Sequence, residues 1–116
     1  MEVCFFETKE ALRIWFNANA ATEPELILGF YRKGVPKQGV SYDDAVIEGL
    51  RVGWIDSLTR RIDDESYSIR FTPRKPKGNW TARNIARVEE MIVNGEIHPL
   101  GLAAFNRRPK PEQSDS

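Results

Sequence analysis

The feature that most constrains this chain is a strict alternation of apolar and polar residues just past its middle. The apolar members are Tyr67, Ile69 and Phe71, and the polar members are Ser68, Arg70 and Thr72. Because neighbouring side chains of a strand point to opposite faces, this pattern predicts a strand with one buried and one polar face. Residues 54–62 and an acidic turn at 63–65 complete a predicted hairpin, and Pro73 is expected to end it because proline has no N–H to donate.

Helix signals flank this hairpin on both sides. Ser41 is followed by Asp44 in the spacing of a capping box, and apolar residues then recur at helical intervals. Thr8 and Thr81 are expected to cap two further helices, and Pro99 suits the first position of a short last helix.

The remaining apolar run, residues 25–33 (ELILGFYRK), is short and reads as a third strand. We therefore predict an α+β fold: a small, mainly antiparallel sheet of about three strands with four helices packed on it. A length of 116 residues fits one domain, which we place at 1–108. The polar, proline-containing segment 109–116 is expected to be a disordered tail.

Composition excludes several classes of protein. The 17 basic and 17 acidic residues cancel, which argues against a nucleic-acid coat or a polybasic membrane binder. One cysteine, Cys4, cannot form an intramolecular disulfide. The first residues do not resemble a signal peptide, and no apolar run approaches the ~20 residues that span a bilayer. We expect a cytoplasmic protein without membrane insertion.

Four segments in order resemble a known family. Residues 53–56 (GWID), 63–74 (DDESYSIRFTPR), 80–89 (WTARNIARVE) and 99–104 (PLGLAA) are similar to the GWID, RFTPR, W-S-x-x-N and P-x-G elements of the YdeI/OmpD-associated (OmdA, bacteriocin-protection) family. The likeness covers roughly residues 5–106, with Gly78 and Thr81 at positions where the family often has serine. It implies a role linked to protection against bacteriocins or cationic antimicrobial peptides. It implies no catalytic residue.

The basic charges are unevenly placed. Between Ser66 and Val88 there is no acidic residue, whereas the segment contains Arg70, Arg74, Lys75, Lys77, Arg83 and Arg87. The segment also holds a predicted helix start at Thr81, whose free N–H groups favour an anion. The candidate site combines Arg74, Lys77, Gly78, Asn79, Thr81 and Asn84 around a phosphate or carboxylate, with Trp54 and Trp80 as apolar walls. Its partner would be a small anion or an acidic protein. The competing interpretation is that these charges only solvate a surface and pair with the acidic segment before them.

Two interpretations of the hairpin remain open. Trp54 and Asp56 lie two positions apart and so share one face of a strand, and Arg70 lies on the next strand. In one interpretation Trp54, Asp56, Arg70 and Arg74 form the floor of a polar pocket. In the other, Trp54 is core and Asp56 pairs with Arg70. A shift of one residue in register would put Arg70 on the opposite face from Asp56.

Signals for catalysis and metal binding are weak. His98 is the single histidine and is expected to serve the start of the last helix, and no spacing typical of a zinc site, a nucleophile elbow or a phosphate-binding loop is present. We expect no metal and no cofactor, and an enzyme is disfavoured. Two alternatives stay open: an enzyme acting on a phosphorylated or nucleotide-like metabolite with Asp56 as base, and nucleic-acid binding through residues 70–87.

Overall fold

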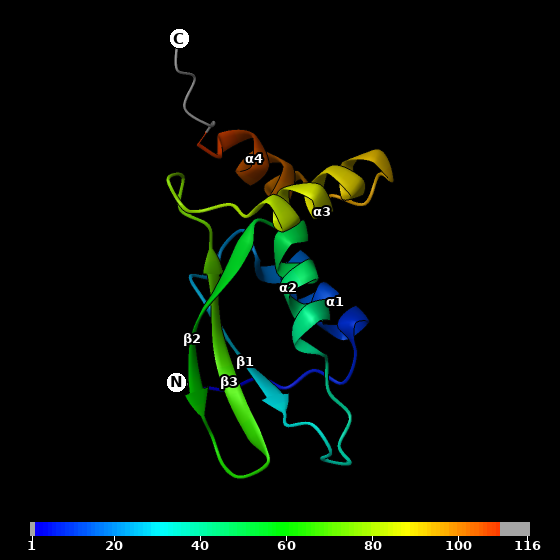
Figure 1. Ribbon diagram of the computed structural model, residues 1–116, viewed down its shortest axis with the longest axis vertical. Coiled ribbons are helices and arrows are strands. Elements are labelled where there is room, and N and C mark those ends of the chain that lie inside the picture. The colour runs from blue at the N-terminus through cyan, green and yellow to red at the C-terminus, as the bar shows by residue number, and fades with distance from the viewer. Residues whose placement is uncertain (1, 110–116) are drawn as a thin grey trace.

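The computed structural model describes residues 2–109 and has the predicted α+β architecture. Three antiparallel strands form one sheet, and four helices pack against it (Figure 1). In chain order the elements are α1 (Lys9–Asn19), β1 (Leu26–Tyr31), α2 (Tyr42–Arg51), β2 (Trp54–Arg61), β3 (Ser66–Pro73), α3 (Ala82–Val93) and α4 (Pro99–Arg107). All but the first residue of the tail predicted at 109–116 lies outside the described residues.

The predicted hairpin forms the centre and one edge of the sheet. The strand order is β1-β3-β2, and β3 pairs antiparallel with both neighbours. The acidic turn closes the hairpin because the Asp63 carboxylate accepts hydrogen bonds from the Glu65 N–H and the Ser66 hydroxyl, each at 2.8 Å. A register shift between Asp56 and Thr59 marks a bulge in β2, which the sequence pattern did not indicate.

All four predicted helix starts are confirmed. The side-chain oxygens of Thr8, Ser41 and Thr81 each accept a backbone N–H of the first turn at 3.1 Å. Pro99 occupies the start of α4, and Nδ1 of His98 accepts the first free N–H of that helix at 3.0 Å. These bonds satisfy donors that have no partner inside the helix, which is why the residue types could be recognised in advance.

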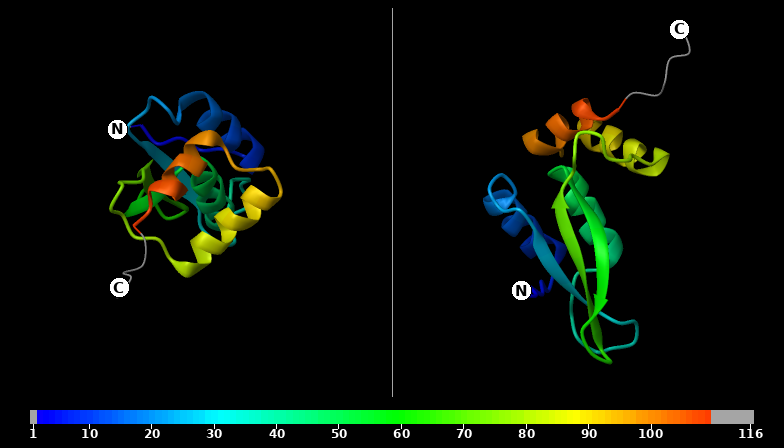
Figure 2. Two further views of the ribbon diagram at one scale, coloured as in Figure 1. Left: turned by 90° about the horizontal axis from the view of Figure 1, so that it is seen from above. Right: turned by 90° about the vertical axis from the view of Figure 1, so that its left-hand side faces the viewer.

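The helices form two layers with separate apolar clusters. Helices α1 and α2 cover one face of the sheet, whereas α3 and α4 lie across one end of the molecule (Figures 1 and 2). The sheet cluster includes Phe16, Leu28, Trp54 and Phe71. The end cluster joins α2, α3 and α4 through Leu50, Val88, Met91 and Phe105. Helix α2 contributes to both clusters and so connects the two layers.

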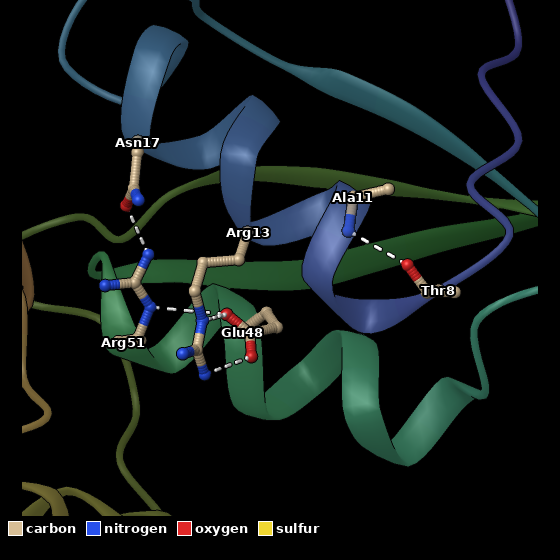
Figure 3. Close-up of polar contacts among 6 residues, drawn as sticks. All are labelled: Thr8, Ala11, Arg13, Asn17, Glu48 and Arg51. Carbon is tan, nitrogen blue, oxygen red and sulfur yellow. Dashed lines mark hydrogen bonds and ion pairs between the residues drawn. The ribbon is translucent and has the colours of Figure 1, made fainter.

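A buried ion cluster ties α1 to α2 (Figure 3). Glu48 is 1% exposed, and its carboxylate accepts hydrogen bonds from Arg13 at 3.0 and 2.8 Å and from Arg51 at 3.2 Å. Arg51 in turn donates to Asn17. The Glu48 carboxylate holds the pKa of Arg13 above its ordinary value. Sequence reasoning missed this cluster, because the acid and its partner in α1 lie far apart in the chain.

Helix α4 sits against the end of α2 at a very close approach. A Cβ built on Gly101 would lie 2.1 Å from the carbonyl oxygen of Arg51, so only glycine fits there. The same carbonyl accepts the His98 N–H at 3.2 Å. In the described part of the chain, no helix is long and apolar enough to cross a membrane.

Candidate functional site

The candidate site is organised around Arg74, the first residue after β3. Its backbone N–H donates to the carbonyl of Gly53 at 2.9 Å, which holds the end of the hairpin together. The residue is 7% exposed. Its guanidinium carbon lies 4.2 Å from the centre of the Trp80 ring, and Nη1 donates to the Asn79 carbonyl at 3.1 Å. The loop that begins at Arg74 therefore folds back over its side chain.

The charge of Arg74 is not matched by an acid. Among the ion pairs of residues 2–109, none involves Arg74, and its Nε is buried without a hydrogen-bond partner. Burial lowers the pKa of the Arg74 guanidinium. The charge of Asp56 raises this pKa to a smaller degree, although the two side chains form no ion pair. A buried cation in this state is costly, because it has lost hydration and gained no opposite charge.

Trp80 lines the larger of two hollows in the surface. Its ring meets Phe105 of α4 edge-on, with the ring centres 5.7 Å apart. One cavity of about 450 Å³ is lined by Lys77, Gly78, Asn79, Trp80, Ile85, Arg108 and Pro109. A smaller one of about 200 Å³ is lined by Ile55, Thr72, Pro73, Arg74, Lys75 and Gly78. Gly78 borders both, and neither lining contains an acidic residue.

Arg108 was not among the residues predicted from sequence. It caps the end of α4, where its guanidinium lies 3.7 Å from the Phe105 ring centre and Nη1 donates to the Phe105 carbonyl at 2.8 Å. Helix packing brings it to the cavity that also contains Lys77. A basic residue directly after an expected helix end is the one sequence signal that points to it.

Thr81 and Asn84 lie at the start of α3, next to the site. The Thr81 hydroxyl oxygen is engaged by the Asn84 N–H, and the Asn84 amide oxygen accepts a hydrogen bond from Arg87 at 3.4 Å. Neither residue lines the two cavities at Trp80. Both residues therefore act in this structure as helix-start groups.

Three predicted site residues lie elsewhere, which corrects the expected pocket. Trp54 is 2% exposed in the sheet cluster, with its ring N–H 3.3 Å from the carbonyl of Ala20, so it forms no wall opposite Trp80. Asp56 accepts a hydrogen bond from the Tyr42 hydroxyl at 2.8 Å.

Arg70 forms an ion pair with Glu25 at 2.7 Å instead of with Asp56. The register explains the difference: Asp56 is opposite Phe71, so Arg70 points to the other face of the sheet. The alternative in which Asp56 pairs with Arg70 is therefore wrong, as is the pocket floor that needed both.

The arginines of α3 are also drawn away from the cavities. Arg87 lies 2.8 Å and Arg83 lies 3.9 Å from the carboxylate of Asp43 in α2. The basic stretch therefore has two parts. Acidic partners are present for Arg70, Arg83 and Arg87. Among the described residues there is none for the cavity-lining Arg74, Lys75 and Lys77. The interpretation in which basic residues pair with the acidic segment holds for Arg83 and Arg87 with Asp43, whereas an anion site at Arg74 and Lys77 stays a prediction.

Metal ligation and thiol chemistry have little support from the geometry. Within residues 2–109 no group of three or more His, Cys, Asp or Glu side chains is placed to hold a metal ion. Burial, and to a lesser degree Glu2, raises the pKa of the Cys4 thiol, which disfavours the reactive thiolate.

These features define a small α+β domain. Its sheet is covered by helices on one face, and a basic cavity without acidic lining residues lies beside α3. The chain belongs to the family described as Domain of unknown function (DUF8412), whose model matches residues 4–104. Comparison with curated proteins and with solved structures found no match. The description of this family names no activity. The resemblance to the YdeI/OmpD-associated family therefore supports a proposal and not an assignment.

Proposed function

We propose that this protein is a noncatalytic binding domain for a small anion, either a phosphate or carboxylate ion or the acidic end of a larger partner. The anion binds in the smaller cavity, where the Arg74 guanidinium contacts it, and Lys77 and Arg108 of the larger cavity add positive charge at longer range. Gly78 lines both cavities, and the Trp80 ring stacks on the guanidinium.

The state of Arg74 is the observation that carries this proposal. A side chain that is 7% exposed retains a charge with no ion pair among the described residues and a buried Nε with no acceptor. An anion in the cavity that Arg74 lines would supply the missing opposite charge. The planar guanidinium fork suits phosphate and carboxylate oxygens, and such charge-assisted bonds are about twice as strong as neutral ones.

The enzyme alternative has less support. It needs Asp56 as a base close to Arg70 and Trp80, yet Asp56 and Arg70 lie on opposite faces of the sheet, and neither lines the cavities at Trp80. Nucleic-acid binding through residues 70–87 is also weakened, because Arg70 and Arg87 have acidic partners in the fold.

The physiological setting is proposed on sequence resemblance alone. The motifs shared with the YdeI/OmpD-associated family suggest a cytoplasmic role in protection against bacteriocins or cationic antimicrobial peptides. A basic cavity repels a cationic peptide, so the site would bind an anionic partner in that pathway and leave the peptide itself unbound.

The test is a titration of the ¹⁵N-labelled protein with inorganic phosphate and separately with acetate, at constant ionic strength set with chloride. We expect saturable shifts at the backbone amides of Gly78 and Asn79. Replacing Lys77 with Gln, which removes an exposed charge, should weaken binding by about three- to tenfold.

Arg83→Gln is the matched control, because its side chain is 76% exposed and lies outside both cavities. Saturable binding with no effect of Lys77→Gln, or an equal effect of Arg83→Gln, would show that the anion binds elsewhere. No saturable shift with either anion would reject the site.

A further inference from the structure

Among the described residues, 2–109, no helix covers the face of the sheet opposite α1 and α2. The right-hand view in Figure 2 looks onto this face, with the two helices behind the strands. A groove of about 580 Å³ crosses it, within the range of about 300–1,000 Å³ that ligand pockets occupy. Its lining consists of Val3, Ile27, Leu58, Arg60, Arg61, Ile62, Ser68 and Arg70.

Ser68 is the one small residue in the lining of the groove and lies on its floor. Ser68 of the central strand pairs with Gly29 of β1 and Arg60 of β2. The Phe5 ring lies over Gly29, where an added Cβ would be 2.5 Å from it. Apolar side chains stand on both sides of this floor, so the groove has raised walls instead of being a flat sheet surface.

The apolar lining faces water. Leu58 of β2 is 52% exposed and Ile62, just after β2, is 38% exposed, and Val3 and Ile27 line the opposite side. Exposed apolar side chains that line one concave surface are typical of a binding site, whereas scattered ones carry no such meaning.

The polar part of the lining is entirely cationic apart from one hydroxyl. Arg70 is held by Glu25 at 2.7 Å, and Arg61 is bonded to Asp64 at the hairpin tip. Arg60 has no ion pair among residues 2–109, and no acidic residue lines the groove. The occupant that complements this surface has an apolar body and a negative charge.

We propose that this groove binds a single-chain amphiphile with an anionic head, of the long-chain carboxylate class. The chain lies on Val3, Ile27, Leu58 and Ile62, and the head group meets Arg60. An acidic peptide fits less well, because its backbone N–H groups would find one acceptor side chain in the lining, the Ser68 hydroxyl, whereas an acyl chain needs none. This site is separate from the anion site at Trp80 and does not depend on it.

The experiment uses the whole chain, ¹⁵N-labelled, and sodium dodecanoate below the concentration at which it aggregates. We expect saturable amide shifts in β2 and β3 around Arg60 and Ser68, which acetate does not produce; any shift that acetate also produces at Gly78 and Asn79 belongs to the anion site. Dodecyltrimethylammonium, with the same chain and opposite charge, should bind at least about tenfold more weakly.

Two variants separate the head-group contact from the chain contact. Arg60→Gln and Leu58→Gln should each weaken dodecanoate binding by about tenfold. Their matched controls are Arg83→Gln and Val93→Gln, which change an arginine and an apolar residue exposed on α3 and should have no effect.

Three results would overturn the proposal. They are the absence of saturable binding, equal binding of the cationic amphiphile, and dodecanoate shifts that leave the groove residues unaffected. Adsorption to anionic phospholipid vesicles without binding of monomeric dodecanoate would assign the face to membrane contact instead. Phosphate binding is measured by the amide shifts of Gly78 and Asn79, which lie outside the groove. Each of the two proposed sites can therefore be rejected without rejecting the other.

Discussion

The guanidinium of Arg74 stacks on Trp80, 4.2 Å from its ring centre, and the same ring meets Phe105 of α4 edge-on. A residue from the end of the hairpin and one from the last helix therefore both contact one ring of the following loop. Cation–π stacking of this kind is worth about 0.5–2 kcal/mol, which orients the guanidinium but does not replace its lost hydration. The arrangement holds a positive charge at a fixed place beside a cavity.

Replacing Arg74 with Met should separate binding from stability. Met retains an unbranched chain against Trp80 but removes the desolvated charge, so the free energy of unfolding without ligand should stay equal or rise by about 1 kcal/mol. Added phosphate should raise the stability of the original protein and leave the variant unchanged. Urea unfolding with and without phosphate measures both effects.

The control is Arg83→Met, which should keep the phosphate effect. A loss of more than about 2 kcal/mol in Arg74→Met without phosphate would make Arg74 a structural residue. Arg74→Ala is a poorer test, because at 7% exposure the shortened side chain would leave a void.

Removing the Glu48 carboxylate should destabilise the fold strongly. In Glu48→Ala, Arg13 and Arg51 lose their shared acceptor, and breaking a buried ion cluster from one side costs about 3–5 kcal/mol. Chemical unfolding gives the difference. The exposed Glu89→Ala should change stability by less than about 0.5 kcal/mol, and an effect of Glu48→Ala as small as that would contradict the role of the cluster.

Gly101→Ala should reverse the usual effect of such a substitution. In an exposed helix, alanine stabilises by about 0.5–1 kcal/mol over glycine. Here the added methyl would lie 2.1 Å from the Arg51 carbonyl oxygen, so α4 must move and we expect a loss of about 1–3 kcal/mol. The melting temperature of Asn106→Ala, a change at an exposed position of the same helix, provides the comparison. A gain in stability for Gly101→Ala would show that α4 is not packed as described.

His98 should make stability depend on pH. Burial, and then the charge of Arg51, lower the pKa of His98 below its ordinary value of 6.5. As the pH falls, the unfolded chain therefore takes up a proton before the folded one does. The contribution is present above about pH 6.5 and is lost as the pH decreases through and below that value.

In His98→Asn the amide can still cap α4 but cannot titrate, so its unfolding free energy should fall less between pH 7.5 and pH 5 than that of the original protein. Denaturant unfolding at both pH values tests this. Identical pH dependence of the two proteins would show that His98 does not contribute to the pH dependence of stability.

Much of the fold follows from short-range patterns in the sequence. The cap bonds of Thr8, Ser41 and Thr81 join residues three positions apart, and the alternation of β3 is set by the geometry of the strand itself. Such signals need no knowledge of the rest of the molecule, and for that reason the three strands and four helices could be predicted. The lack of acids between Ser66 and Val88 likewise pointed to Arg74 and Lys77, because it is visible in the order of residues alone.

Which charges meet was decided by the tertiary structure alone. The strand register sends Arg70 to Glu25 on the helix-free face, helix packing pairs Arg87 with Asp43, and α4 brings Arg108 to the cavity of Lys77. These contacts join residues about 30 to 45 positions apart, and a shift of one residue or a small rotation of a helix would exchange the partners. The sequence determined the elements and their polar and apolar faces, whereas packing buried Arg74 without an acidic partner among residues 2–109.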